Sequence, residues 1–303
     1  MTVDRALLEG RARVRPLPAP GLVLLVAVAA MSWSGPLVKL SEAPALAISA
    51  WRLIFSVGFI AAVLAWRGGR PVRLEAREWI LAVVSGALLA GHFWAWIASV
   101  ELTTVSSSVV LVSVQTPFVA VLSIVWLGER PGRRHWLGIG AAVVGAATIG
   151  WGDFGRGGAA IAGDLLALAG AAFVAGYFVA GRRLRARLDL WTYTGVVYGV
   201  AAAILALAVV AHPGVDLTGY APREWGIFLA LAAGPMLLGH SGVNYALRYV
   251  PAYVANLAVL GEPVGATLLA WVLPGIGEAP HAQTLVGGAL ILCGIAVGAR
   301  RER

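Results

Sequence analysis

Residues 104–152 read TVSSSVVLVSVQTPFVAVLSIVWLGERPGRRHWLGIGAAVVGAATIGWG. Two apolar runs, 104–127 and 134–152, lie on either side of a short segment that contains Arg130, Arg133 and Arg134. A helix of about 20 apolar residues crosses a hydrocarbon core of about 30 Å, so each run is long enough to span a membrane. The stretch therefore predicts two transmembrane helices joined by a basic loop.

The same alternation extends along the whole chain. Of its 303 residues, 59% are hydrophobic and 13% are charged, whereas a soluble domain has about a quarter charged residues. The runs lack the period-two alternation of barrel strands, and helices pair their backbone groups internally, as lipid requires. We therefore expect an all-α polytopic membrane protein. Ten helices are expected, at 21–41, 45–66, 78–100, 104–127, 134–152, 160–181, 191–211, 224–246, 252–273 and 281–299.

The basic residues predict the orientation of these helices. One set of 19 occupies the first 20 residues and every second loop, whereas the intervening loops hold only Lys39, Arg156 and Arg223. Cytoplasmic loops are the basic ones, so both termini are expected in the cytoplasm of a bacterium, with the helices in its inner membrane. The larger set is Arg5, Arg11, Arg13, Arg15, Arg67, Arg70, Arg73, Arg77, Arg130, Arg133, Arg134, Arg182, Arg183, Arg185, Arg187, Arg248, Arg300, Arg301 and Arg303.

Composition also excludes several classes of protein. The net charge of +8 is divided among short clusters between apolar runs, which is typical of topology signals and gives no reason to expect a nucleic-acid partner. The single cysteine, Cys293, allows no intramolecular disulfide and no cysteine metal cluster. No nucleotide-binding loop is present, which excludes a primary pump. We expect no cofactor and no metal; the expected partners are the lipid bilayer and a small-molecule substrate.

Two halves of the chain resemble each other. Gly91 and His92 precede Gln115-Thr116-Pro117, and Gly239 and His240 precede Gly261-Glu262-Pro263. Val105 lies 12 residues before Pro117 and Pro251 lies 12 residues before Pro263, but the two Gly-His pairs disagree by two positions. The pattern predicts an internal repeat.

The repeat predicts a domain organisation. A cytoplasmic tail is expected at 1–20, a first repeat of five helices at 21–152 and a second at 160–299. Because five is odd, the second repeat enters the membrane upside down relative to the first. Inverted repeats are frequent in secondary transporters, with the substrate site near the midplane between them.

Five stretches together resemble the drug/metabolite transporter superfamily and specifically its EamA-type repeats. They are MSWSGPLVKL (31–40), AWRLIFSVGF (50–59), QTPFVAVLSIVWLGERPGRRHWLGIGAAVVGA (115–146), GDLLALAGAAFVAGYFVAGRRL (163–184) and LAVLGEPVGATLLAW (257–271). The resemblance implies a ten-helix carrier in which helices one to four and six to nine surround a central cavity. Within the superfamily the chain is most similar to the YddG-type exporters of aromatic amino acids. One departure is PGIGEAP (274–280), which replaces an LGER-like end in the second half, so the resemblance assigns no role to that loop.

Several polar and aromatic residues inside the expected helices are candidates for the substrate site. Arg52 in helix two could bind a carboxylate, or it could snorkel to the outer surface or pair with Glu42. In helix three His92 and Trp96 share a face suited to a flat apolar substrate, with Trp94 beside them. The alternative for both tryptophans is an interfacial aromatic belt.

The second half and the proline-containing helices add further candidates. His240 and Asn244 share a face of helix eight, where a polar contact between helices is the alternative. Pro117 and Pro263 are expected to bend helices four and nine as hinges, unless the kinks only improve packing. Glu262 is a candidate for proton exchange because a carboxyl group in apolar surroundings gains from protonation, and a structural role for it is the favoured alternative. The remaining substrate-site candidates are Trp33, Ser113, Gln115, Tyr177 and Asn256.

The function expected from these features is export of small metabolites by alternating access, with aromatic or other hydrophobic amino acids as the first candidates. Export of other metabolites or drugs is the alternative within the superfamily. A channel, an intramembrane hydrolase using Ser34 and His92, and a structural scaffold are the rivals from other classes. No hydrolase or zinc motif accompanies Ser34 and His92, so no enzyme is expected. Glycines in helices five and ten predict close helix packing, either within the chain or in a homodimer.

Overall fold

The structure is a computed structural model that describes residues 18–68, 73–151, 157–280 and 282–298. Every regular element in these ranges is a helix, which confirms the all-α expectation. The N-terminal tail, Arg70, Arg156 and the C-terminal arginines lie outside the described residues. The elements are α2 (Pro20–Met31), α3 (Ser34–Leu40), α4 (Ala45–Arg67), α5 (Ala76–Leu102), α6 (Val105–Val112), α7 (Gln115–Leu122), η1 (Ser123–Leu127), α8 (Arg133–Gly150), α9 (Gly158–Arg185), α10 (Leu190–Ala211), α11 (Pro222–Leu231), η3 (Ala232–His240), α12 (Ser241–Ala246), α13 (Ala252–Val259), α14 (Glu262–Val272) and α15 (Ala282–Gly298).

Eight helical segments are long and apolar enough to cross a membrane, with mean hydropathy between 1.3 and 2.3. Four of them are assembled from shorter helices that follow one another, such as α6, α7 and η1. The eight do not include α8, of 18 residues, or α15, of 17 residues. The chain is therefore a multi-pass membrane protein, and a total of ten crossings stays a prediction.

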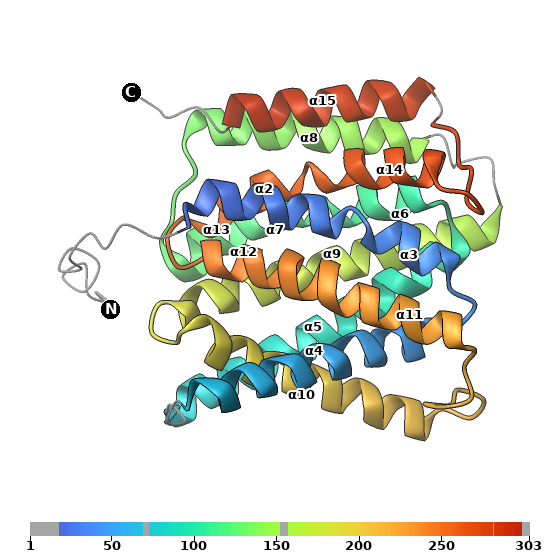
Figure 1. Cartoon of the computed structure of the whole chain (residues 1–303). Coiled ribbons are helices and arrows are strands. Elements are labelled where there is room, and N and C mark those ends of the chain that lie inside the picture. The colour runs from blue at the N-terminus through green and yellow to red at the C-terminus, as the bar shows by residue number, and fades with distance from the viewer. Residues whose placement is uncertain (1–17, 69–72, 152–156, 281, 299–303) are drawn as a thin grey trace.

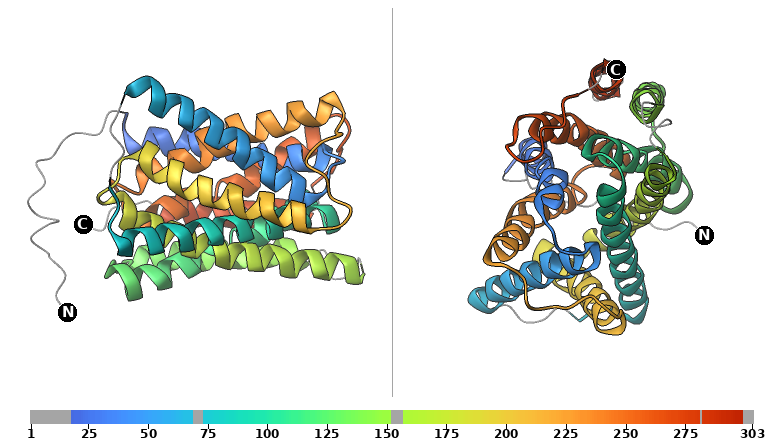
Figure 2. Two further views of the ribbon diagram at one scale, coloured as in Figure 1. Left: turned by 90° about the horizontal axis from the view of Figure 1, so that it is seen from below. Right: turned by 90° about the vertical axis from the view of Figure 1, so that its right-hand side faces the viewer.

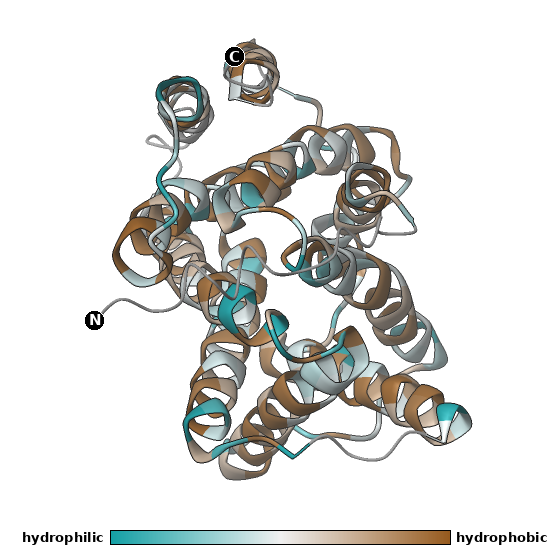
Figure 3. Ribbon diagram, turned by 90° about the vertical axis from the view of Figure 1, so that its left-hand side faces the viewer, coloured by the Kyte–Doolittle hydropathy of each residue, from teal (hydrophilic) through white to brown (hydrophobic). Residues whose placement is uncertain are grey.

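The helices lie side by side in a bundle, with α8 and α15 packed against each other at one edge (Figures 1 and 2). The first helix, α2, begins at the same end of the bundle at which α15 finishes (Figure 1). Hydrophobic residues dominate the helices, and hydrophilic residues gather at their ends (Figure 3). This distribution fits a bundle surrounded by lipid.

Helix contacts follow a two-repeat pattern. α5 of the first repeat packs along α9 of the second. The equivalent contact, with the two repeats exchanged, joins α2 of the first repeat to η3 and α12 of the second. α4 packs against α10, and the span of α6 and α7 packs against the span of α13 and α14, so each of these spans contacts its own counterpart. A three-residue repeat supports the pairing: Arg77-Glu78-Trp79 occupies the second to fourth positions of α5, and Arg223-Glu224-Trp225 the same positions of α11.

A π-helical segment explains why the two Gly-His pairs are out of register. Glu224 follows Glu78 by 146 residues, but His240 follows His92 by 148. The nine-residue segment η3 lies between Glu224 and His240, whereas α5 is α-helical throughout. A π-helix has about one residue more per turn than an α-helix, so two turns absorb about two residues. The two histidines consequently meet in space, with ring centroids 6.0 Å apart.

Glycines allow the close contact between α8 and α15. A Cβ atom on Gly138 would lie 2.5 Å from the carbonyl oxygen of Gly294, and one on Gly145 would lie 2.5 Å from that of Gly287. In contrast, a Cβ atom on Gly140 or Gly288 would meet nothing within 4 Å. The expected close packing is therefore made within the chain, and a homodimer through either helix stays a prediction.

We expect Gly138→Val to destabilise the protein by about 1–3 kcal/mol, because the added side chain overpacks the α8–α15 contact. Gly140→Val is the matched control, since it adds the same side chain two residues away where there is space. Thermal unfolding of the two purified variants in detergent measures the difference. Equal midpoints would show that the glycine contact does not hold α8 to α15.

Candidate functional site

Three broken helices meet at the centre of the bundle. Breaks occur at Ser32–Trp33 between α2 and α3, at Ser113–Val114 between α6 and α7, and at Leu260–Gly261 between α13 and α14. Ser32 Oγ lies 3.5 Å from the carbonyl oxygen of Glu262, and a Cβ atom on Gly265 would collide with it. The two residues at each break keep right-handed helical φ and ψ angles, and the second of them donates its N–H to the carbonyl oxygen three residues earlier, as in a tight 3₁₀ turn.

A central cavity lies beside these breaks. The cavity has a volume of only about 20 Å³, well below the range of about 300–1,000 Å³ typical of ligand pockets, so the side chains around it must move apart to admit a substrate. Both halves of the chain contribute to its wall. The lining residues are Met31, Ser34, His92, Phe93, Trp96, Val112, Gln115, Val174, Phe178, His240 and Glu262.

Two stacked ring pairs form much of the wall. His92 stacks on Trp96, with centroids 6.3 Å apart and planes at 11°, and His240 stacks on Phe178 at 6.1 Å and 9°. His92 Nδ1 lies 2.9 Å from the carbonyl oxygen of Gly170 on α9. Because a carbonyl only accepts, Nδ1 carries the proton, and the Nε2 atom of the neutral ring is left as an acceptor.

Two buried residues of opposite charge flank the cavity. Arg52 is fully buried; it donates to Ser34 Oγ at 3.4 Å, and its guanidinium carbon lies 4.0 Å from the centroid of Phe93. Both contacts are with lining residues, so Arg52 lies directly behind the wall. Glu262 is in the wall itself and interacts electrostatically with Arg52. Within the described part of the chain, Arg52 Nε and Nη2 have no hydrogen-bond partner.

The position of Arg52 decides between the alternatives that the sequence left open. Its side chain does not snorkel to a surface, since none of it is exposed. Glu42 is instead 3.7 Å from Arg223 at the protein surface. A buried cation without a carboxylate partner is costly in a membrane protein and is typical of a substrate or ion pathway.

A second polar cluster adjoins the cavity and consists of Tyr177, Tyr198, Ser241 and Asn244. Asn244 Nδ2 donates to the hydroxyl oxygens of Tyr177 at 2.5 Å and Tyr198 at 3.2 Å. The Tyr198 hydroxyl lies 3.2 Å from Ser241 Oγ. The ring centroid of Tyr177 is 6.3 Å from that of His240, so the cluster continues the cavity wall into the second repeat.

The structure brings only part of the predicted site together. His92, Trp96, Gln115, His240 and Glu262 line the cavity. Trp94 and Trp33 are not among the lining residues, and their side chains are 45% and 42% exposed.

The polar residues of helices four and nine have local partners. Ser113 donates to the carbonyl oxygen of Val109, and Asn256 donates to that of Ala252. α7 begins two residues before Pro117, and α14 begins one residue before Pro263, so each proline lies in the first turn after a break. Hydroxyl and amide groups that bond their own helix are common in lipid.

Apolar lining residues were missed in the sequence. Phe93 and Phe178 are each adjacent to a predicted residue, and Val112 and Val174 look like any other core valine. The signal that could have found Phe93 is its spacing from Trp96 and Ala90, which gives the buried face of α5. Among the described residues, no group of three or more His, Cys, Asp and Glu side chains could hold a metal ion.

Comparisons with known proteins agree with this architecture. No curated protein sequence matches the chain. A protein of known crystal structure superimposes with a TM-score of 0.74 over 92% of this chain and 96% of its own, and at 22% identity this likeness establishes the fold alone. The model of the EamA-like transporter family matches twice, at residues 20–151 and 161–299, which together make up most of the chain. The two matches confirm the expected pair of repeats, and the protein belongs to the EamA-like transporter family, a family of membrane transporters of small metabolites.

Proposed function

We propose that the protein is a secondary transporter that exports aromatic or other hydrophobic amino acids by alternating access, as in YddG-type exporters. The observation that carries this proposal is that the fully buried Arg52, two of whose nitrogen atoms have no hydrogen-bond partner among the described residues, lies behind the wall of an aromatic-lined cavity that also contains Glu262. An α-amino acid is a zwitterion, and a site that recognises it needs one group of each charge. The family match supports transport of a small molecule but does not choose among substrates.

The proposed mode of recognition places each part of the substrate against matching chemistry. The substrate carboxylate faces Arg52, whose two unpaired N–H groups offer charge-assisted hydrogen bonds when Phe93 or Ser34 moves aside. The ammonium group faces Glu262 and the acceptor nitrogen of His92. A flat apolar side chain fits between the stacked pairs that include Trp96 and Phe178.

The proposed orientation follows from charge. Arg67, Arg77, Arg133 and Arg182 belong to the end of the bundle where α2 begins and α15 finishes, whereas Lys39 and Arg223 belong to the opposite end. By the positive-inside rule the first end is cytoplasmic in a bacterial inner membrane. The cavity then lies between two five-helix repeats of opposite orientation, at 21–152 and 160–299.

We expect proteoliposomes containing the protein to take up phenylalanine and tryptophan in a saturable manner. Phenylalaninamide, which lacks the carboxylate, and phenylpropionate, which lacks the ammonium group, are expected to compete poorly with phenylalanine. Uptake of labelled phenylalanine, tryptophan and threonine, with and without a pH gradient, makes the measurement. No uptake of any of the three would rule out the amino-acid assignment; flux that never saturates would indicate a channel.

Arg52→Gln is expected to lower phenylalanine uptake at least about tenfold, because the substrate carboxylate would lose its charge-assisted hydrogen bonds to the guanidinium group. Arg223→Gln, which removes an exposed arginine, is the matched control and is expected to retain uptake. Equal rates in the two variants, at equal protein in the membrane, would exclude Arg52 from substrate recognition.

Glu262→Gln tests the proposed exchange of protons. The amide keeps the shape of the side chain but cannot carry a transferable proton. We expect the variant to exchange phenylalanine more slowly, because the ammonium group loses a charged partner, and to show no stimulation of the remaining uptake by a pH gradient. Stimulation that persists in the variant would show that Glu262 does not couple protons to transport.

A further inference from the structure

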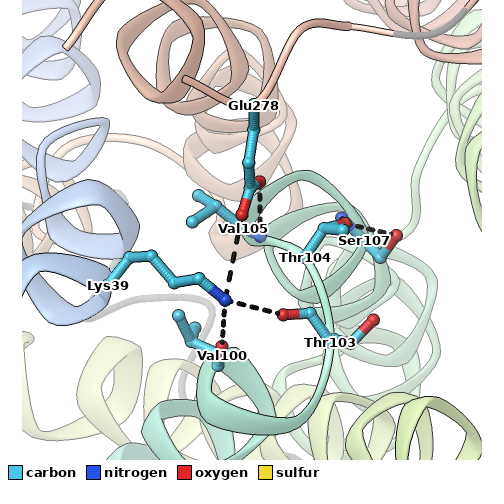
Figure 4. Close-up of polar contacts among 7 residues, drawn as sticks. All are labelled: Lys39, Val100, Thr103, Thr104, Val105, Ser107 and Glu278. Carbon is cyan, nitrogen blue, oxygen red and sulfur yellow. Dashed lines mark hydrogen bonds and ion pairs between the residues drawn. The ribbon is translucent and has the colours of Figure 1, made fainter. Parts of the chain in front are cut away.

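One cluster of charged side chains closes the end of the bundle near residues 39 and 278 (Figure 4). Lys39, at the end of α3, lies 3.8 Å from Glu278, in the segment that follows α14. Lys39 Nζ also donates to the carbonyl oxygens of Val100 at 3.4 Å and Thr103 at 3.3 Å, where α5 ends. The second oxygen of Glu278 accepts from the backbone N–H of Val105, at the start of α6. The cluster thus ties both repeats together at one mouth of the cavity.

A second cluster closes the opposite end. Arg182, at the end of α9, lies 2.7 Å from Glu129, in the segment that follows η1. Arg182 Nη1 also donates to the carbonyl oxygen of Leu247, just after α12, at 2.5 Å. The second oxygen of Glu129 accepts from the backbone N–H of Ala252, at the start of α13, at 3.0 Å.

The two clusters are equivalent under the repeat. In each, the cation comes from the end of the first helix of one repeat, and the carboxylate follows the fourth helix of the other. Each carboxylate accepts from the first N–H of the other repeat's fourth helix, a donor that has no partner within its own helix. The cation also binds carbonyl oxygens at the end of its own repeat's third helix.

The backbone around the two glutamates is also equivalent. Each follows a glycine in the left-handed region, Gly128 at φ 68° and Gly277 at φ 63°. Each has its own N–H bonded back to the preceding helix, to Ser123 and to Ala270, both at 3.1 Å. The segment PGIGEAP, for which the resemblance gave no role, therefore supplies the counterpart of the LGER glutamate.

Solvent exposure separates these clusters from ordinary surface ion pairs. The side chains of Lys39 and Glu278 are 34% and 21% exposed, and those of Arg182 and Glu129 are 21% and 17% exposed. The pair Arg223–Glu42 at the first end is 56% and 86% exposed. Shielded pairs that also make backbone hydrogen bonds are less screened by salt and harder to replace with water.

We infer that Lys39–Glu278 and Arg182–Glu129 are two latches that open alternately to admit and release the substrate of the central cavity. Both are closed in this structure, in agreement with a cavity of only about 20 Å³. Opening one latch separates the third and fourth helices of one repeat from the facing helices of the other at that end. The inference depends on the proposed alternating access for its purpose, but the latches can be tested without any substrate.

The test measures access to the cavity from each side. A reporter cysteine, Val174→Cys, is placed in the cavity wall of a chain whose only cysteine is removed by Cys293→Ala. A charged, membrane-impermeant thiol reagent is added to right-side-out and to inside-out membrane vesicles. The rate of labelling from each face reports how often that end opens.

We expect Lys39→Gln to raise labelling from its own end about fivefold, because loss of one ion pair shifts the balance toward opening at that end. Glu129→Gln is expected to raise labelling about fivefold from the opposite end only. The controls are Arg223→Gln and Arg183→Gln, which remove exposed arginines at the same two ends and are expected to leave both rates unchanged. Lys39→Arg is expected to restore slow labelling, which separates loss of the latch from misfolding.

A double variant tests the pairing itself. If Lys39 and Glu278 act together, adding Glu278→Gln to Lys39→Gln is expected to raise labelling little beyond either single change. Rates that change equally from both faces, or that change as much in the controls, would overturn the latch assignment. Normal latch behaviour without phenylalanine uptake would reject the proposed substrate alone, whereas uptake with unchanged labelling would reject the latches alone.

Discussion

A peptide group in hydrocarbon has no water to bond, so each spanning helix must pair its own backbone groups. In this protein three spans are broken, between α2 and α3, between α6 and α7 and between α13 and α14. Residues beside each break line the cavity, and the hydroxyl of Ser32 lies 3.5 Å from a carbonyl oxygen of the neighbouring span. The tight turns keep the backbone hydrogen-bonded where these spans change from one helical segment to the next, beside the cavity.

The absence of water in the hydrocarbon core also restricts where charged side chains can lie. A guanidinium or carboxylate is expensive inside a bilayer, and the described charges occur either at the two ends of the bundle or around the cavity. At the ends they bind one another and free N–H and carbonyl groups of helix termini. At the centre, Arg52 and Glu262 form no ion pair with each other among the described residues. Arg52 Nε and Nη2 have no hydrogen-bond partner there, so these donors are left for a ligand.

Local features of the sequence were sufficient to predict the helices, the membrane environment and the two repeats, because hydrophobicity and segment length depend on neighbouring residues only. The cavity wall depends on how each helix is rotated about its axis. Trp94 and Phe93 are adjacent, yet only Phe93 lines the cavity, and single-residue spacing does not show this in a segment that is apolar all round. The role of Glu278 was hidden for another reason: its surrounding residues differ from those of Glu129, and only the backbone conformation is shared.

The π-helical segment η3 has a consequence for energetics. A carrier built from two identical halves would have inward-open and outward-open states of equal free energy, since exchanging the halves converts one state into the other. The wide turns of η3 occur in the span formed by α11, η3 and α12. Its counterpart in the first repeat, α5, keeps regular α-helical geometry. The exchange symmetry is thereby broken within the wall of the cavity itself, so the inward-open and outward-open states of the proposed carrier are no longer required to have equal free energy.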